Sequence, residues 1–341
     1  MGARTGSAIR CLGVATALSC LGWTGCGASP QETGLTLGFF ELRDFIDCAV
    51  PVPGEVRFEN HSTDAERRDA PVDPSRPSVV LIHGWNGYRA LLGCGAYVWP
   101  ARMAEALRPV VGESANILVI NYDVLAWQRD QVLTGLFKDM ARDFARFCRS
   151  AGVDHDLHVI AHSAGAELAC DILTELGFLR QLTLLDGPDV TRQRLLADWA
   201  GFLERVGLVE NYWVSRPFGI GADLPSAANV CNILLLSGYA NNSAAVHFAP
   251  VSWYRKTITD RAVVGGFGWS FIAGAARAGG TDFIESNGLL FARPADGSMS
   301  GWTDDLQGPA PLLRRAMNDG LLRPETAAGL ARDLGLVFVG P

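Results

Sequence analysis

Residues 157–170 read LHVIAHSAGAELAC, and this stretch decides the fold prediction. Its first four residues are mostly apolar and partly β-branched, which is typical of a short buried strand. From Leu168 onward apolar residues recur at helical spacing until Gly177, and glycine commonly follows the last residue of a helix. The stretch therefore predicts a strand, a tight turn around Ser163 and a helix.

The turn has small residues on both sides of Ser163, with Ala161 two positions before it and Gly165 two positions after it. A strand, a sharp turn of this kind and a helix are the context of a nucleophile elbow, which holds a serine hydroxyl above the sheet edge at a helix N-terminus. An ordinary strand-to-helix turn that contains a serine is the alternative. The catalytic interpretation requires a base, an orienting acid and an oxyanion hole elsewhere in the chain.

Strand and helix patterns alternate from residue 78 to residue 185. Repeats of this size predict an α/β fold, with a mostly parallel central sheet and helices on both of its faces. In such sheets the active site lies beyond the carboxyl ends of the strands, where Ser163 is also expected. The predicted strands are 79–82, 117–120, 157–160, 181–185, 208–214 and 230–236, with an outer strand near 56–58. The predicted helices are 100–111, 132–150 and the segment that ends before Gly177.

His247 is the candidate base. A serine hydroxyl is a weak nucleophile near pH 7 and needs a base beside it. Of the six histidines, His247 is the only one downstream of Ser163, and it follows the polar turn 241–243. A histidine in a late loop is where a fold of this kind places its base. A surface histidine is the alternative.

Asp186 is the candidate acid. It directly follows the apolar run 182–185, so it is expected at a strand end, and it lies between the serine and the histidine in chain order. An aspartate in this role fixes the imidazole tautomer and stabilises the imidazolium. A turn-capping aspartate is the alternative. Asp189, beyond a Gly-Pro pair, and Asp223, in a later loop, are weaker candidates for the same role.

An oxyanion hole needs two backbone N–H donors. Ala164, directly after the serine, supplies the first candidate. The second is expected in the loop after the first core strand, where residues 83–87 read His-Gly-Trp-Asn-Gly. Gly84 permits a tight turn that directs the N–H of Trp85 toward the site. A His-Gly pair alone is a weak signal, but it gains weight directly after an apolar strand and upstream of an elbow.

Four segments of the chain carry a resemblance to a known family. In chain order they are LIHGWNG at 81–87, VIAHSAG at 159–165, LTLLDGP at 182–188 and VHFAPVSWY at 246–254. Together they resemble the pancreatic-type lipase family of the α/β-hydrolase fold, and the resemblance covers roughly residues 76–260. It implies Ser163 as nucleophile, Asp186 as the acid after the sixth strand and His247 as base. It also implies Trp85 and Ala164 as the oxyanion donors.

The composition is that of a globular protein, with 48% hydrophobic and 19% charged residues. A formal net charge of −7 argues against nucleic acid as the main partner. The cysteine spacings show no metal-ligand pattern such as C-x-x-C, so we expect no metal site, and no cofactor is implied. Outside the N-terminal segment the number of cysteines is odd, so at least one thiol is expected to stay free or to pair outside the chain. These cysteines are Cys48, Cys94, Cys148, Cys170 and Cys231. Export would make one or two disulfides possible.

The first 30 residues resemble an export signal. Two arginines are their only charges, and the apolar run 11–23 has thirteen residues, whereas a helix that spans a bilayer needs about 20. Residues 1–25 are therefore predicted to be a signal peptide. Its end resembles a bacterial lipoprotein cleavage site with Cys26 as the lipidated residue, which would anchor the exported protein to a membrane at the cell envelope. Cleavage after Ala28, which gives a secreted protein, is the alternative.

The predicted organisation places an N-terminal linker and outer strands at 26–75, the catalytic core at 76–260, and a C-terminal extension packed on the core at 261–341. The predicted function is a serine ester hydrolase, similar to a lipase or esterase, that acts on small acyl esters or lipids through an acyl-enzyme. Acyl transfer by the same three residues is one alternative. A non-catalytic binding protein that kept the fold is another.

Overall fold

The computed structural model describes most of the chain between residues 56 and 292. Two compact units are present, residues 1–36 and 37–341, and every element below lies in the second unit, apart from Thr36 at the start of the first strand. The described residues are 56–63, 70–84, 96–122, 135–214, 220–235, 243–259, 265–274, 282–286 and 289–292, with the strand residues 36–37, 40–41, 46–47 and 337–340.

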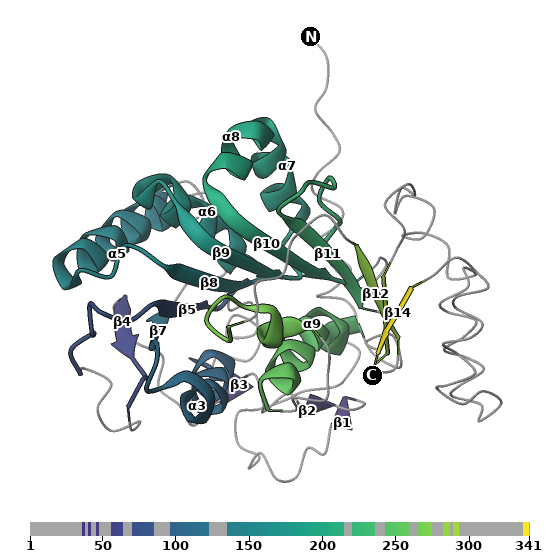
Figure 1. Cartoon of the computed structure of the whole chain (residues 1–341), viewed down its shortest axis with the longest axis horizontal. Coiled ribbons are helices and arrows are strands. Elements are labelled where there is room, and N and C mark those ends of the chain that lie inside the picture. Colours follow the sequence, from purple (N-terminus) through teal and green to yellow (C-terminus); the bar gives the residue numbers. More distant parts are fainter. Residues whose placement is uncertain are drawn as a thin grey trace, which may run out of the picture. The chain divides into compact units, whose positions relative to one another are not determined.

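A ten-stranded sheet forms the centre of the part that the structure describes (Figure 1). From one edge to the other its order is β4 (Arg57–Asn60), β7 (Asn116–Asn121), β5 (Ser78–Ile82), β8 (Leu157–His162), β9 (Leu179–Leu185), β10 (Val206–Trp213), β11 (Val230–Leu235), β12 (Phe283–Ser286), β13 (Leu289–Ala292) and β14 (Val337–Gly340). The seven strands from β7 to β12 run parallel, while β4, β13 and β14 pair antiparallel with their neighbours. Two small sheets pair β1 (Thr36–Leu37) with β2 (Phe40–Glu41), and β3 (Ile46–Asp47) with β6 (Ala96–Tyr97).

The central strands are buried on both faces. Every residue of β5, β8 and β11 is buried, which explains why their sequences are apolar runs without alternation. The strand pattern predicted from the sequence is thereby confirmed in the core. β4, from the predicted linker segment, forms one edge of the sheet, and β12 to β14, from the predicted C-terminal extension, continue it at the other edge.

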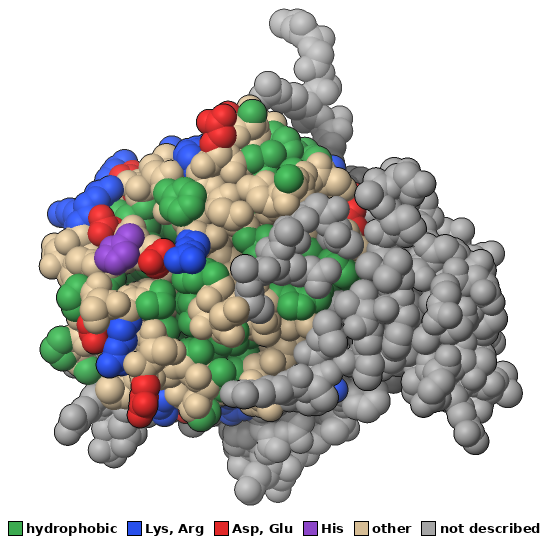
Figure 2. Space-filling view, in the orientation of Figure 1, with side chains coloured by type: hydrophobic (Ala, Val, Ile, Leu, Met, Phe, Trp, Pro, Cys, Tyr) green, Lys and Arg blue, Asp and Glu red, His purple; other side chains and the backbone are tan. Residues whose placement is uncertain are grey.

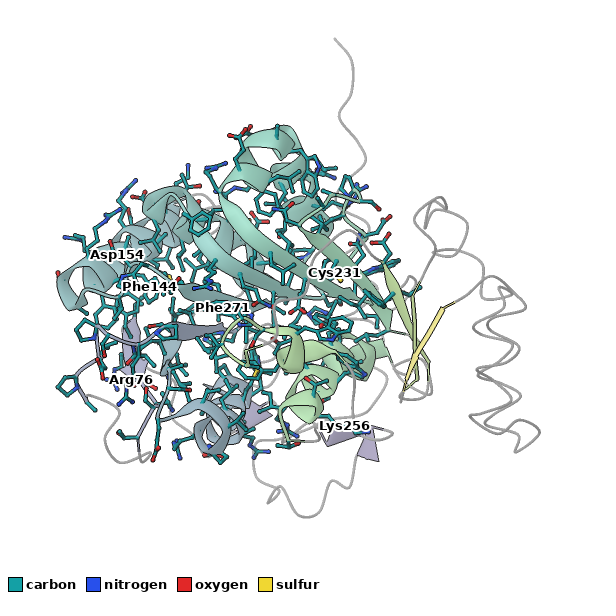
Figure 3. The ribbon with its side chains drawn as sticks, in the orientation of Figure 1. Arg76, Phe144, Asp154, Cys231, Lys256 and Phe271 are labelled. Atoms are coloured by element: carbon teal, nitrogen blue, oxygen red, sulfur yellow. The ribbon has the colours of Figure 1, made fainter. Side chains whose placement is uncertain are left out.

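Helices cover both faces of the sheet, as the sequence predicted (Figure 1). Each face has its own apolar core. Phe144, a residue of a helix, belongs to the core of one face, and Cys231, a residue of β11, belongs to the core of the other (Figure 3). The helices of the first face are α5 (Phe137–Ala151), α6 (Gly165–Leu176), α7 (Asp189–Ala197) and α8 (Trp199–Glu204). Those of the second are α3 (Trp99–Val111), α9 (Ser243–Thr259) and the short 3₁₀ helix η6 (Gly266–Trp269).

Helix ends follow the glycine signals in the sequence. Gly152 directly follows α5 and Gly177 directly follows α6, and each has a positive φ that glycine adopts at little cost. The helix predicted over 132–150 begins as an α-helix at Phe137, and residues 132–134 lie outside the described residues. Acidic and basic side chains intersperse on the exposed surface in Figure 2, and α5 contributes pairs three residues apart, such as Arg142 with Asp139. Within the described residues, no helix combines the length and apolar character needed to cross a bilayer.

His247 lies within a helix, α9, and the prediction of a loop at this position is wrong. Ser243, the last residue of the polar stretch that precedes the histidine, is already the first residue of α9. The apolar residues that follow, including Phe248 and Val251, then recur at helical spacing and pack into the core of the second face. The buried apolar residues of α9 therefore place His247 on a helix instead of in a loop.

Candidate active site

Ser163 occupies the turn between β8 and α6. Its φ is +54°, in the left-handed region that residues with a side chain rarely adopt, and its N–H donates to the carbonyl of Leu185 at 3.1 Å. Backbone strain of this kind persists only where the surrounding structure enforces it, and it is frequent at active sites. The geometry is that of the predicted elbow, with the side chain at the carboxyl end of the parallel sheet.

Two glycines make this turn fit its surroundings. A Cβ on Gly84 would lie 2.6 Å from the Cβ of Ser163 and 3.1 Å from its Oγ. A Cβ on Gly165 would lie 2.4 Å from the carbonyl oxygen of His83. Neither approach leaves room for a side chain, so the loop after β5 and the elbow contact each other directly. Ala161, which replaces the first glycine of the usual elbow motif, is fully buried in β8.

Asp186 ends the neighbouring strand in a similar way. Its φ is +49°, its side chain is fully buried, and its N–H donates to the carbonyl of Tyr212 at 2.7 Å. Its carboxylate accepts backbone N–H groups from Val214 at 3.3 Å, Ile220 at 3.2 Å and Gly221 at 3.0 Å. Hydrogen bonds from these three donors fix the orientation of the carboxylate.

Gly221 contacts the carboxylate of Asp186, and no motif in the sequence had pointed to it. A Cβ there would lie 2.6 Å from Oδ1 of Asp186 and 3.0 Å from the Cβ of Trp213, so only glycine lets this N–H reach the carboxylate. A glycine in the loop that follows the strand next to the acid's strand is the signal that could have identified it.

His247 binds Asp186 through a short hydrogen bond, with 2.6 Å between Nδ1 and Oδ2. The carboxylate accepts a hydrogen bond from Nδ1–H, so in the neutral ring Nε2 is the unprotonated nitrogen. The imidazole side chain is 21% exposed. Among the described contacts, Ser163 Oγ and the imidazole form no hydrogen bond; in serine enzymes this contact often tightens only when substrate binds.

The other two candidate acids contact different partners. Asp189 begins α7 and accepts from the side chain of Gln193 at 3.0 Å. Asp223 is half-buried, and burial raises its pKa, while its main-chain carbonyl accepts from Arg192 Nε at 2.7 Å. Of the three aspartates, Asp186 is the one that the structure brings to His247.

Of the two predicted oxyanion donors, Ala164 is among the described residues and Trp85 is not. Ala164 precedes the first helical residue of α6, so its N–H has no partner within the helix and is available to an oxyanion. Trp85 lies outside the described residues, as does Cys26, the predicted lipidation site.

The loop before Trp85 is held by an aromatic pair that the sequence did not indicate. The rings of His83 and Tyr122 stack with centroids 4.0 Å apart, and the Tyr122 hydroxyl donates to the carbonyl of His83. The Nδ1 of His83 lies 2.7 Å from the carbonyl oxygen of Gly84, and burial lowers the pKa of this histidine to about 4. The ring is therefore neutral and fixes the backbone that approaches Ser163. Tyr122 directly follows β7, where an aromatic at a strand end was the available signal.

The described residues contain no group of three or more His, Cys, Asp or Glu side chains that could hold a metal ion. Cys148 and Cys170 are buried thiols without a disulfide, and burial raises the pKa of each to about 12. They lie in α5 and α6, so neither is part of the site. Cys48 and Cys94 lie outside the described residues.

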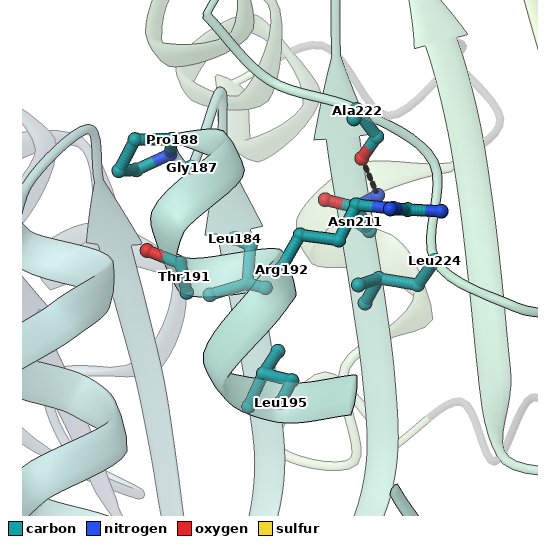
Figure 4. A pocket seen from close by; sticks show the side chains of 9 residues that line it. All are labelled: Leu184, Gly187, Pro188, Thr191, Arg192, Leu195, Asn211, Ala222 and Leu224. Carbon is teal, nitrogen blue, oxygen red and sulfur yellow. Dashed lines mark hydrogen bonds between the residues drawn. The ribbon is translucent and has the colours of Figure 1, made fainter. Parts of the chain in front are cut away.

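A small pocket opens beside the strand end that carries Asp186 (Figure 4). It lies between α7, β9 and β10, and Asn211 donates to the carbonyl of Ala222 across one side of it. Ser163, Asp186 and His247 do not line it. Its lining residues are Leu184, Gly187, Pro188, Thr191, Arg192, Leu195, Asn211, Ala222 and Leu224.

The strand order places the β8 turn near the centre of a parallel sheet, with a serine at the turn, an acid at the end of the next strand and a histidine on a later helix. The fold is that of the α/β-hydrolases. It requires this strand–turn–helix context around the serine, and the chain order serine, acid, histidine matches it as well.

No protein family and no curated protein matches the sequence. Among solved structures, a predicted CIB-like hydrolase from Thermoplasma acidophilum is similar with a TM-score of 0.35 and 12% identity, over 62% of this chain and 96% of that one. A lipase-esterase related protein from Clostridium acetobutylicum has a TM-score of 0.35 and 10% identity, over 60% and 98%. A fungal esterase structure from Rhizomucor miehei has a TM-score of 0.33 and 12% identity, over 62% of this chain and 84% of that one. Because these TM-scores are below 0.5, the similarities support no conclusion about activity.

Proposed function

We propose that the protein is a serine hydrolase of carboxylic esters, with Ser163 as nucleophile, His247 as base and Asp186 as the orienting acid. The observation that carries the proposal is the 2.6 Å hydrogen bond between His247 and Asp186, from a carboxylate that three backbone N–H groups also hold. It lies at the strand end next to a serine in elbow geometry. A buried acid that orients an imidazole beside such a serine is the arrangement that activates a hydroxyl.

In the proposed reaction, the Oγ of Ser163 attacks the acyl carbonyl carbon while Nε2 of His247 takes the hydroxyl proton. The N–H groups of Ala164 and Trp85 stabilise the oxyanion that forms. The tetrahedral intermediate then expels the alcohol, which receives the proton from His247. Water attacks the acyl-enzyme, His247 takes a proton from that water, and the carboxylic acid leaves with the serine regenerated.

Fluorophosphonate labelling tests the proposal at the nucleophile. The wild-type protein should be labelled at Ser163 and should hydrolyse a short, soluble nitrophenyl ester. The Ser163→Ala variant should lose labelling and lose about three to six orders of magnitude in turnover. Ser150→Ala, at an exposed position of α5, is the matched control and should behave as wild type.

Near-normal hydrolysis by a folded Ser163→Ala protein would contradict the proposal. If the wild type is labelled but transfers its acyl group to an added alcohol in preference to water, the same residues serve an acyltransferase. If the wild type is neither labelled nor active, the fold serves binding alone.

We also propose that the protein is exported and carries lipid on Cys26, because small residues and a short apolar run precede this cysteine. A single acyl chain binds a membrane only marginally, so firm attachment requires more than one chain. Mass spectrometry of the protein from a bacterial host should find a lipidated N-terminal peptide that begins at Cys26. An unmodified mature N-terminus at Ser29 would refute lipidation.

A further inference from the structure

His162 links the strand of the nucleophile to the helix of the base. It is the last residue of β8, directly before Ser163, and it is fully buried. Its Nε2 lies 3.0 Å from the carbonyl oxygen of His247, which is 85 residues away in the sequence. The two imidazole rings lie beside each other with centroids 4.5 Å apart, and Phe248 stacks on the His162 ring at 5.1 Å.

The hydrogen bond defines the tautomer of His162. A carbonyl oxygen only accepts hydrogen bonds, so Nε2 must carry the proton and donate it. Nδ1 is buried and has no hydrogen-bond partner among the described residues, which suits an unprotonated nitrogen. Burial, with smaller contributions from His247 and His83, keeps the pKa of His162 well below its ordinary value. The ring is therefore neutral and in one tautomer.

The first part of α9 needs support from outside the helix. Pro250 lies three residues after His247, and proline has no N–H and crowds the preceding turn. The carbonyl of residue 246 thus lacks its usual helical donor, and the ladder around His247 is weakened. The side-chain donor of His162 reaches the next carbonyl, that of His247, and so ties this turn of α9 to β8.

The charge of His162 also matters to the reaction. In the proposed mechanism His247 becomes an imidazolium when it takes the serine proton. A positive charge on a ring 4.5 Å away would oppose this step, whereas a neutral ring does not.

We propose that His162 is a positioning residue for His247: its Nε2–H holds the main chain of the base through the His247 carbonyl, and its neutral ring packs beside the imidazole. The role rests on the proposed function. It concerns orientation of the base, so its loss should reduce kcat, while the affinity for a short ester should change little.

Two substitutions separate the hydrogen bond from packing. His162→Met introduces an apolar side chain of similar length, which preserves packing but removes the Nε2–H donor. His162→Gln keeps a neutral N–H donor that can reach the same carbonyl. His158→Met is the matched control, because His158 is also fully buried in β8 with an unpartnered Nδ1, but it contacts Thr183 instead of the site.

His162→Met should lower kcat for a short nitrophenyl ester by about ten- to a hundredfold, with KM within about twofold of wild type. His162→Gln should recover most of kcat. His158→Met should lose stability to denaturant but keep its kcat. Nitrogen-15 NMR of the wild type should show His162 as the neutral Nε2–H tautomer at pH 7, a readout that needs no activity and no variant.

A wild-type kcat in folded His162→Met overturns the inference, as does an equal loss in His162→Gln or in His158→Met. If His162→Met does not fold, the kcat of His162→Gln and the tautomer of His162 in the wild type test the inference instead. An Nδ1–H tautomer or a charged His162 ring at pH 7 contradicts the proposed role. Failure of the proposed function looks different: the wild type would then show neither labelling nor hydrolysis.

Discussion

Two residues of the proposed site share one local arrangement. Ser163 and Asp186 each directly follow a parallel strand, each has a φ near +50°, and each donates its N–H to a carbonyl of the next strand in the sheet. Since β8 and β9 are neighbours, both side chains emerge at the same edge. At both positions the left-handed backbone therefore directs the side chain of a proposed site residue away from the core of the sheet.

Asp186→Asn tests the acid at this scale. An amide cannot hold the imidazole in the same tautomer or balance the imidazolium, so turnover should fall by about 10⁴ while the fold is retained. Asp223→Asn and Asp189→Asn should be mild, because these residues contact Arg192 and Gln193 instead of the base. Steady-state kinetics on a short ester, with circular dichroism for folding, measures this. An active Asp186→Asn protein together with a crippled Asp223→Asn protein would place the acid in the later loop.

At the scale of elements, the described aromatic residues of α8 and β10 pack into the interior. Tyr212 and Trp213 are buried in β10, and Phe202 of α8 is 1% exposed and belongs to the core of the first face. Their burial explains why α8 packs against the sheet: a six-residue helix has too few hydrogen bonds to be stable alone.

Phe202→Ala should therefore destabilise the protein. Removal of a fully buried phenyl ring leaves a cavity and typically costs about 3–5 kcal/mol in the free energy of unfolding. Phe178→Ala is the matched control, because Phe178 is 50% exposed and its loss should cost less than about 1 kcal/mol. Urea unfolding at constant pH compares the two variants. Equal effects would show that α8 contributes little to the core.

For the whole molecule, buried neutral histidines link stability to pH. Burial lowers the pKa of His83 to about 4 and that of His158 to about 3. In the unfolded chain a histidine binds its proton below about pH 6.5. Between that pH and the folded values, the unfolded state binds more protons, so the contribution of each histidine is complete above about 6.5 and is lost as the pH falls.

The free energy of unfolding should therefore fall between pH 7 and pH 5, by about 2 kcal/mol for each such histidine. His158→Gln retains an amide donor for the hydroxyl of Thr183, but glutamine does not titrate. The free energy of unfolding of this variant should therefore decrease less between pH 7 and pH 5 than that of the wild type. His155→Gln changes an exposed residue and should keep the wild-type slope. Identical slopes for wild type and His158→Gln, measured by urea unfolding at both pH values, would contradict the assignment.

The sequence by itself determined the elements of the core. A strand buried on both faces is mostly apolar, a helix packed on a sheet repeats its apolar residues at helical spacing, and a sharp turn favours small residues on both sides. These are local requirements, so the strand before Ser163, the helix that ends at Gly177 and the parallel sheet could all be predicted from short stretches.

Only the tertiary structure decided what surrounds the proposed site. The N–H of Gly221 reaches Asp186 across 35 residues, and the ring of His162 reaches the carbonyl of His247 across 85. It also set the base on a helix, because buried apolar residues of α9 outweighed the signal of the polar turn before it. Such contacts depend on which strand ends the sheet order brings together, and no short stretch of the chain records that order.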